Sequence, residues 1–417
     1  NALFLEKRGR LKMDESPEWS GCFKIRMSQH NQKRDTDMQF NRILIATAAA
    51  LACGAASAAN VNVYGVIDLG VGVARTSGSN ADGSAVPTTT AASMNSGMRN
   101  SSRFGLKGTE QLGDYKVGFI LESQFKADDG TFQTAGKLWE REASLSVAGP
   151  FGKVTAGHLG LLKGVIGSTA LMNSYRVNPF GSNTSKFSGG FKAYTTGTAW
   201  YADNAIVYST PKMNGLDLHI QYSNAFSGQE GETSNKNSRY LAGAVRYMSG
   251  PLLLQVIADT TNLGSEKGGA SAAQTDRKSR DPMSLNVAAA YDFGVVKPYA
   301  IAEVFKDSTL NSVGGWVTTK AGEAYDGAGG TFVLQFPVFG GKAKVGGGYM
   351  KASLSDEGNG RKSDIRRWGA SAGFDYVLTK RTHLYSNAGY IDQKEDAANG
   401  TNRRKGSEVI LGTVHYF

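Results

Sequence analysis

The most distinctive charged constellation in this sequence is a stretch between Gly160 and Trp200 that carries four cations and no carboxylate. The cations are Lys163, Arg176, Lys186 and Lys192. Fixed charges of one sign, held inside a narrow site of low dielectric, raise the local concentration of anions and repel cations. In an exposed surface loop the same residues would only be solvated. The chemistry that this stretch predicts is therefore ion selection, provided that something confines it.

Residues that would support catalysis or metal binding are sparse. Beyond residue 58 the histidines are scattered without metal-ligand spacing: His158, His219, His383 and His415. Neither GxxxxGK followed by Ser or Thr nor HExxH occurs, and the glycine run 346–348 lies in a strand pattern with no following helix. We therefore expect a packing or lumen role for that run, no enzyme, no cofactor and no metal. A Ser–His hydrolase built on a barrel stays open as an alternative, because serines are abundant.

Hydrophobic periodicity indicates strands with one apolar and one polar face. Around Trp368 the even positions are apolar and the odd positions are small or charged. Around Phe119 the odd positions are apolar, whereas Lys116, Glu122 and Lys126 share the other face. Such alternation is typical of β-strands. It fits either a soluble sandwich, with the apolar face as its core, or a membrane barrel, with the apolar face toward lipid.

Connection lengths favour the membrane barrel. Short turns and long polar connections alternate strictly, so the long connections gather at one end of the sheet, and segments of about ten residues match tilted spanning strands. The long connections include 77–100, 161–203, 263–282, 307–329 and 394–406. The sixteen expected strands are 61–76, 101–111, 115–126, 138–148, 152–160, 204–211, 216–226, 238–249, 252–262, 283–293, 296–306, 330–339, 341–354, 365–378, 382–393 and 407–417. We predict an all-β, 16-stranded antiparallel transmembrane barrel with short periplasmic turns and long external loops.

Composition excludes several other classes. Of 417 residues, 40% are hydrophobic and 20% are charged, and no run of eighteen strongly apolar residues occurs, which excludes a helical membrane protein. The net charge is +10, but the basic residues are dispersed, so we expect no nucleic-acid partner.

The first sixty residues have the composition of a leader. Arg42 precedes the apolar run 43–54, and Ala56-Ser57-Ala58 matches a cleavage site. We expect 38–58 to be a signal peptide, 1–37 to be an upstream extension absent from the mature protein, and 59–417 to form the barrel. A buried N-terminal helix and a lipoprotein signal at Cys53 are the alternatives.

Several stretches resemble the general trimeric porins of the Gram-negative outer membrane, in the β-proteobacterial branch. They are 63–68 (VYGVID), 102–113 (SRFGLKGTEQLG), 203–211 (DNAIVYSTP) and the terminal 415–417 (HYF). The resemblance runs from about residue 60 to the end. It implies a homotrimer in outer-membrane lipid and lipopolysaccharide, and a third long loop, 161–203, that folds into the pore. It also implies that the last strand, with His415 and Phe417, is read by the barrel assembly machinery.

The resemblance also indicates where the lumen should carry charge. The family commonly places arginines at three points, which correspond here to Arg103, His158 and Tyr201, so two of the three cations are missing. His158 makes pH-sensitive selectivity a hypothesis, since an unperturbed imidazole titrates near neutrality. Strand parity adds Lys107, Lys116 and Glu122 to the expected pore lining.

These observations predict an outer-membrane channel for passive diffusion of small hydrophilic solutes and ions, with a preference for anions. A substrate-specific channel is the nearest alternative, because an aromatic lining would favour it. The loop supplies such residues: Tyr175, Phe180, Phe187, Phe191 and Tyr194. A surface adhesin or structural barrel is the alternative from another class.

Overall fold

The computed structural model describes residues 60–172, 174–181, 186–188, 190–196, 201–226, 230, 237–262, 281–314, 316, 323–355 and 362–417. The predicted extension and signal peptide lie outside these residues, as does most of the connection 263–282. Among the residues that are described, no helix is long and apolar enough to cross a membrane.

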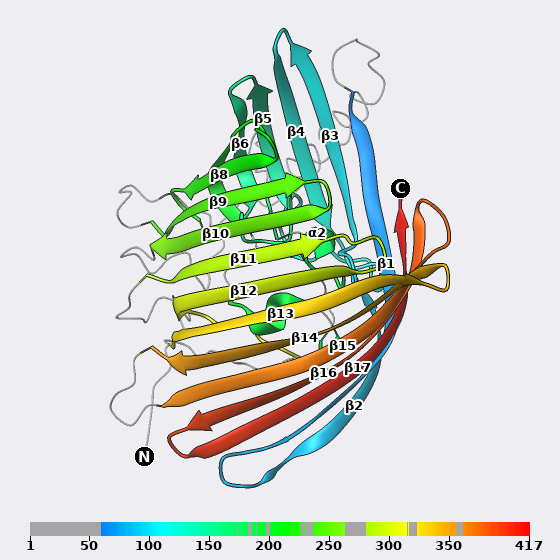
Figure 1. Cartoon of the computed structure of the whole chain (residues 1–417), viewed down its shortest axis with the longest axis vertical. Coiled ribbons are helices and arrows are strands. Elements are labelled where there is room, and N and C mark those ends of the chain that lie inside the picture. The colour runs from blue at the N-terminus through cyan, green and yellow to red at the C-terminus, as the bar shows by residue number, and fades with distance from the viewer. Residues whose placement is uncertain are drawn as a thin grey trace, which may run out of the picture. The chain divides into compact units, whose positions relative to one another are not determined.

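The described chain folds into one antiparallel sheet (Figure 1). Its strands are β1 (Asn62–Ser79), β2 (Ala85–Ser96), β3 (Arg103–Leu112), β4 (Tyr115–Gln124), β5 (Glu142–Gly149), β6 (Gly152–Gly160), β7 (Tyr201–Ser209), β8 (Leu216–Ser223), β9 (Arg239–Ser249), β10 (Leu252–Asn262), β11 (Met283–Tyr291), β12 (Lys297–Ser308), β13 (Tyr325–Val338), β14 (Gly341–Leu354), β15 (Ser363–Val377), β16 (Thr382–Ala397) and β17 (Gly400–Tyr416). Two short helical turns lie between β6 and β7, namely α2 (Ser174–Val177) and η1 (Phe191–Tyr194).

Strand β1 closes the sheet into a barrel. One edge of β1 pairs with β17, from Val66 opposite Tyr416 to Ser79 opposite Arg403. Its other edge pairs with β3 along residues 62–66 and with β2 along residues 69–79. β2 and β3 lie end to end along the same edge of β1 and share one position in the wall. The seventeen strands therefore occupy sixteen positions. The predicted closed 16-stranded antiparallel barrel is therefore confirmed.

Two connections that the sequence analysis treated as long loops, 77–100 and 394–406, are largely strand, and a third, 307–329, is strand at both ends. Residues 85–96 form β2 against β1, in agreement with the β-branched run at Thr88, Thr89 and Thr90, and the strand ends at Gly97, whose φ of +71° starts a bend. β13 begins at Tyr325, within the expected loop 307–329.

Strands β16 and β17 also run through the expected loop 394–406, and Ala397 pairs with Gly400 at their tip. Charged side chains continue this hairpin, because Arg403 bonds Asp392 across the two strands and Arg366 of β15 bonds Asp396. The polar composition of these segments reflects strand extension beyond the apolar band.

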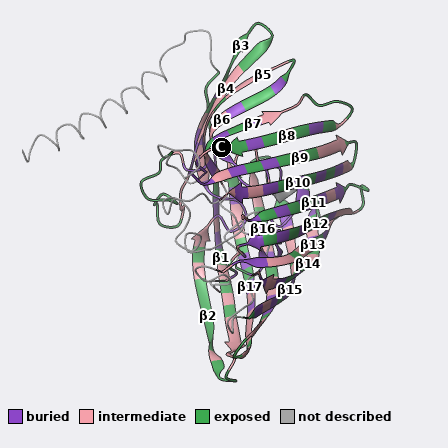
Figure 2. Cartoon of the chain, turned by 90° about the vertical axis from the view of Figure 1, so that its left-hand side faces the viewer, coloured by how far each residue is buried: buried purple, intermediate pink, exposed green. Residues whose placement is uncertain are grey.

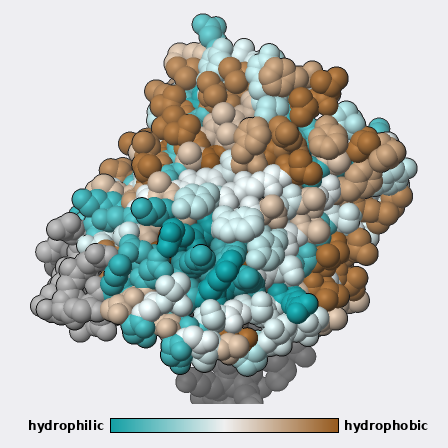
Figure 3. Space-filling model, turned by 60° about the horizontal axis from the view of Figure 1, so that its bottom comes forward, coloured by the Kyte–Doolittle hydropathy of each residue, from teal (hydrophilic) through white to brown (hydrophobic). Residues whose placement is uncertain are grey.

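The barrel wall has an exposed apolar outer face and a buried inner face. Along β9 to β12, exposed residues such as Leu241, Val256, Leu285 and Val304 alternate with buried ones (Figure 2). Hydrophobic and hydrophilic side chains occupy separate zones of the surface in Figure 3. This is the arrangement of a barrel whose apolar band faces lipid and whose other face encloses the interior.

Candidate functional site inside the barrel

The described parts of segment 161–196 lie against the inner wall and are held there by carboxylates. Glu142 of β5 accepts hydrogen bonds from the backbone N–H and the hydroxyl of Ser168, at 2.7 and 2.6 Å. Glu303 of β12 binds the N–H and hydroxyl of Thr196 in the same way, each at 2.6 Å. Glu408 of β17 is a third anchor of this kind, and it binds the N–H and hydroxyl of Ser188. The loop is therefore folded inward.

Cations of β14 and β15 bind carbonyl groups of the same loop. The Lys344 ammonium lies 3.3 Å from the Pro179 carbonyl oxygen, and Arg367 donates to the Ala193 carbonyl oxygen at 2.5 Å. Both side chains are fully buried. A buried charge requires such partners, so these residues specify the path of the loop across the interior.

Four of the five loop aromatics are buried, so they pack the loop against the barrel wall. Phe180, Phe187, Phe191 and Tyr194 are each at most 5% exposed. These four rings therefore do not provide the exposed aromatic lining that the alternative of a substrate-specific channel would use. The Tyr175 side chain lies outside the described residues. The rings pack against the wall and do not line the pore, because burial removes their large apolar area from water.

Glycines of the wall leave space for the aromatic rings and backbone of the loop. A Cβ on Gly348 would lie 2.2 Å from the Tyr194 ring, and a Cβ on Gly389 would lie 2.3 Å from the Phe187 carbonyl oxygen. The sequence analysis expected a packing or lumen role for the run 346–348, and Gly348 packs against the Tyr194 ring. The loop bends at 178–181, since Asn178 Oδ1 accepts the Phe180 N–H at 3.1 Å and Gly181 has a φ of +95°.

The four loop cations differ in their environment. Lys163 is buried, 3.0 Å from the Asp259 carboxylate and 3.1 Å from the Ser284 hydroxyl, so its charge is compensated. Arg176 and Lys186 are exposed. Lys192 is half-buried, and burial together with the nearby Arg141 charge lowers the pKa of its ammonium to about 8.

The wall near β3 and β4 carries a compact cluster around one carboxylate. Glu122 lies 3.3 Å from Arg103 Nε and 2.6 Å from Arg141 Nε, and it accepts the Tyr64 hydroxyl at 2.9 Å. Arg103 and Glu122 were expected on this face. The sequence analysis missed Arg141, because within the expected strand 138–148 it shares the parity of the outward-facing Leu145. In the structure β5 begins only at Glu142, so that parity does not apply to Arg141.

His158 and Tyr201 are neighbours, with ring centroids 5.2 Å apart. His158 Nδ1 bonds the Asp203 carboxylate, and Nε2 bonds the Glu140 carbonyl oxygen at 2.7 Å. Both partners are hydrogen-bond acceptors, so each ring nitrogen of His158 lies against an acceptor.

The remaining expected lumen residues lie toward the short turns. Lys107 lies over the Tyr64 ring, 4.7 Å from its centroid, and Lys116 is exposed near the end of β4. A cluster that the sequence analysis did not single out as a site is centred on Asp375, near the short-turn end of β15. Asp375 binds Arg99 at 3.0 Å and Lys344 at 2.9 Å. Arg99 was missed because it lies within 77–100, which the sequence analysis interpreted as a loop.

The C-terminal strand closes the barrel. The Phe417 N–H and carbonyl group exchange hydrogen bonds with Gly65, each at 3.1 Å, and the His415 ring lies 3.0 Å from the Thr382 hydroxyl. Phe417 is exposed at the rim. This position agrees with an aromatic residue at the membrane interface.

Comparison with known proteins identifies the family. The model of the Gram-negative porin family matches residues 46–396. An outer membrane porin protein of Bordetella pertussis is 29% identical over 410 residues, which cover 89% of this chain and 98% of the relative. Outer membrane porin protein 32 of Delftia acidovorans is 28% identical over 364 residues, covering 86% of this chain and 91% of the relative.

Solved structures share the fold. An anion-selective porin from Comamonas acidovorans superposes with a TM-score of 0.59 at 23% identity, covering 86% of this chain and all of that one. The trimer form of OmpT from Vibrio cholerae gives a TM-score of 0.54 at 17% identity over 87% of this chain and all of that one. With a closed barrel and an inward loop in place, the chain belongs to the Gram-negative porin family and is a channel of the outer membrane, not an enzyme.

Proposed function

We propose that this porin is a passive channel for small hydrophilic solutes and ions that prefers anions. The observation that carries the proposal is the unequal exposure of charges inside the barrel. Glu142, Glu303 and Glu408 are at most 5% exposed and are covered by the loop. Arg176 and Lys186 of the same loop are exposed.

Unequal exposure favours anions for an electrostatic reason. A mobile ion in the pore approaches exposed cations closely, whereas the wall carboxylates are shielded by the N–H groups that they bind. The cluster of Arg103, Arg141 and Glu122, with two cations around one carboxylate, adds positive charge near the loop. Similarity of fold to the anion-selective porin from Comamonas acidovorans supports the same preference.

Reversal potentials in a planar bilayer under a KCl gradient at neutral pH test this proposal. We expect the sign for chloride, and we expect the potential to fall in the double variant Arg176→Gln, Lys186→Gln. Lys351→Gln is the matched control, because Lys351 is exposed on the outer face of β14. A potential with the sign for potassium would contradict the anion preference, and folded protein without conductance would contradict the channel.

The two alternatives make different predictions. A substrate-specific channel would need side chains that contact the solute. The aromatic candidates are buried between the loop and the wall, namely Phe180, Phe187, Phe191 and Tyr194. An adhesin would lose its role when the external loops are trimmed, whereas a diffusion channel would keep its conductance. We expect conductance to persist after such trimming.

We also propose that the porin is a homotrimer. The fold similarity to a porin solved in trimer form supports this, and so does β2, which is exposed on both faces between Thr88 and Ala92 in the described chain. Met94 is outward-facing and 55% exposed. We expect Met94→Lys to yield monomers in size-exclusion chromatography with light scattering and Met94→Leu to yield trimers. A trimeric Met94→Lys variant would place the contact elsewhere.

Export and assembly complete the proposal. We infer that residues 38–58 are cleaved as a signal peptide, so that N-terminal sequencing of protein from the outer membrane starts at Ala59. We further infer that the assembly machinery reads the terminal strand. Phe417→Ser should then lower the amount of barrel in the membrane, whereas protein refolded in detergent should be unaffected. We also propose contact with lipopolysaccharide in the outer leaflet.

A further inference from the structure

The interior of the barrel holds a cavity of about 410 Å³ at the end that carries the short turns. Gly294 and Gly340 of two such turns line it, and so does Pro179 at the bend of the inward loop. The short turns of an outer-membrane barrel lie on the periplasmic side, so the cavity is a periplasmic one. Its volume falls within the range of about 300–1,000 Å³ that is typical of ligand pockets.

Two lysines of the wall line this cavity. Lys297 of β12 and Lys342 of β14 have the same inward parity as the buried residues Tyr299 and Lys344. Lys342 is exposed and has no ion-pair partner among the described residues. Lys297 lies 3.8 Å from Asp292, in a pair whose side chains are 31% and 50% exposed. Exposed pairs contribute little free energy, so both ammonium groups are available to a bound anion.

Positive charge exceeds negative charge around the cavity. Asp375, opposite Lys342 in the sheet register, is buried and is already bound by Arg99 and Lys344 at 3.0 and 2.9 Å. With Asp292 and both lining lysines included, four cations of the described chain accompany two carboxylates here. A ligand with two negative charges would therefore balance the site.

The cavity also offers apolar surface, to which Tyr299, Pro337 and Val377 contribute. The Tyr299 hydroxyl donates to Gln335 Oε1 at 3.1 Å, and the Lys297 ammonium lies 5.5 Å from the centroid of the Tyr299 ring. Because β13 lies between β12 and β14, the strands that carry the two lysines are about 9–10 Å apart. A small organic dianion with one charge at each end fits this arrangement, because it reaches both lysines and its carbon chain covers the apolar surface.

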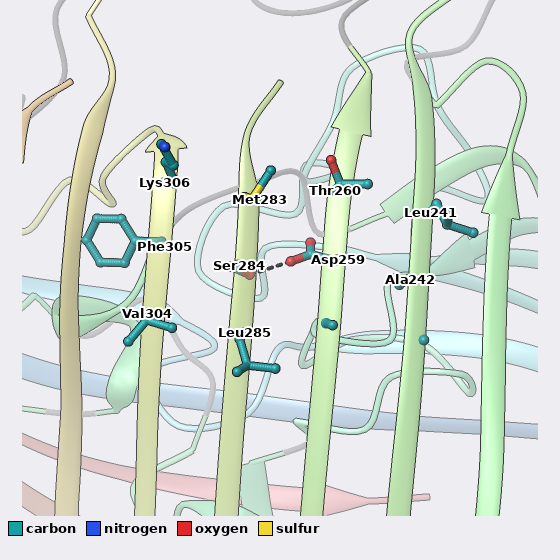
Figure 4. A pocket seen from close by; sticks show the side chains of 12 residues that line it. Leu241, Ala242, Asp259, Thr260, Met283, Ser284, Leu285, Val304, Phe305 and Lys306 are labelled. Atoms are coloured by element: carbon teal, nitrogen blue, oxygen red, sulfur yellow. Dashed lines mark hydrogen bonds between the residues drawn. The ribbon is translucent and has the colours of Figure 1, made fainter. Parts of the chain in front are cut away.

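The loop bend that borders the cavity is held in place, so the site is preformed. Lys344 binds the Pro179 carbonyl oxygen at 3.3 Å. Nearer the start of the loop, Lys163 binds Asp259, which also accepts the Ser284 hydroxyl (Figure 4). A preformed site loses little conformational entropy when a ligand binds.

We propose that this cavity binds a small organic dicarboxylate from the periplasm, with one carboxylate at Lys297 and the other at Lys342. The inference goes beyond the proposed anion preference, since that preference was assigned to Arg176 and Lys186, neither of which lines this cavity. Such a site raises the occupancy of dicarboxylates at the periplasmic mouth of the channel.

Isothermal titration calorimetry with succinate tests the proposal on the whole porin in detergent at low chloride. We expect the wild type to bind one succinate per chain, and we expect Lys297→Gln and Lys342→Gln each to weaken binding at least fivefold. Lys342→Arg keeps the charge and should bind within threefold of the wild type. Lys351→Gln is the matched control, because Lys351 lies on the outer face of the same strand, and it should bind within twofold.

Other results would overturn the assignment. Unchanged affinity in Lys297→Gln and Lys342→Gln, or no binding by the wild type, would mean that the cavity holds no dicarboxylate. Loss of binding only in the double variant Arg176→Gln, Lys186→Gln would place succinate at the inward loop. Inorganic phosphate that binds as tightly as succinate would assign the cavity to anions without an organic body. The KCl reversal potential of the same preparations reports the anion preference separately, so either proposal can fail while the other stands.

Discussion

Glu408 on β17 accepts both the backbone N–H and the hydroxyl of Ser188, each at 2.7 Å from the same carboxylate oxygen. The other oxygen accepts the Lys186 N–H at 2.9 Å, and the Phe187 N–H binds the first at 2.8 Å. One carboxylate of the wall thus fixes three consecutive residues of the inward loop. Because the carboxylate is 5% exposed, its charge is stabilised mainly by these donors.

Replacing this carboxylate should loosen the constriction. We expect Glu408→Gln to lower the free energy of unfolding by about 1–3 kcal/mol, the range for losing charged hydrogen bonds at a buried position. Single-channel conductance should become larger and noisier as the loop moves. Urea unfolding followed by tryptophan fluorescence gives the stability. Asp396→Asn is the control, because that carboxylate is paired with Arg366 on the exposed surface and should change stability by less than about 1 kcal/mol. Unaltered conductance in Glu408→Gln would refute the anchoring role.

A larger side chain in place of a wall glycine that contacts the loop should displace the loop in a different way. A Cβ on Gly389 would lie 2.3 Å from both the Phe187 carbonyl oxygen and the Ser188 Cα atom. Gly389→Val should therefore push the loop away from the wall, narrow the pore and lower single-channel conductance, with an overpacking cost of about 1–3 kcal/mol. Gly243→Ala serves as the control, since its Cβ points into open space. Equal conductance of both variants would show that the loop adapts.

The architecture could be predicted from sequence wherever alternation was strong. Around Trp368 and Phe119 one face is continuously apolar, and these segments form β15 and β4. Residues 85–96 escaped prediction because Ala, Ser and Thr on both faces of β2 produce no alternation. The cations of the inward loop were also visible, because a run without carboxylates is evident in any sequence.

The balance of charge inside the pore could not be predicted, because it depends on pairing across the barrel. Lys163 and Asp259 are 96 positions apart in sequence, and only closure of the sheet brings them to 3.0 Å. Arg141 lies within the expected strand 138–148 but before the start of β5 at Glu142, so parity would have placed it outward with Leu145. Loop aromatics look alike in sequence whether they contact solute or wall, and the glycines that receive them become visible only in the fold.

Lys192 should give the selectivity a pH dependence. Burial, aided by the Arg141 charge, lowers the pKa of its ammonium from 10.5 to about 8. The side chain is therefore charged at pH 6.5 and mostly neutral at pH 9.5, so anion preference should fall as pH rises through about 8. Reversal potentials measured across this range should show a step that Lys192→Gln abolishes. Lys186→Gln should lower the potential at every pH and keep the step.

The same pKa has a consequence for stability. Between about pH 8 and pH 10 the unfolded chain holds a proton on Lys192 that the folded chain has released, so the free energy of unfolding should rise with pH across this window. The rise should be absent in Lys192→Gln. A wild-type pH profile identical to that of Lys192→Gln would mean that the ammonium stays charged inside the barrel.

The Lys163–Asp259 pair should prove more important for stability than for selectivity. Both side chains are at most 8% exposed, so removing one partner leaves a buried charge without its counterpart. Lys163→Met should lower the free energy of unfolding by about 3–5 kcal/mol, and adding Asp259→Leu should recover much of that loss. The double variant should also keep nearly the wild-type reversal potential, because one positive and one negative charge disappear together. A cycle in which the two losses simply add would mean that the ions do not interact. A large drop in anion preference in the double variant would mean that Lys163 reaches the permeation path after all.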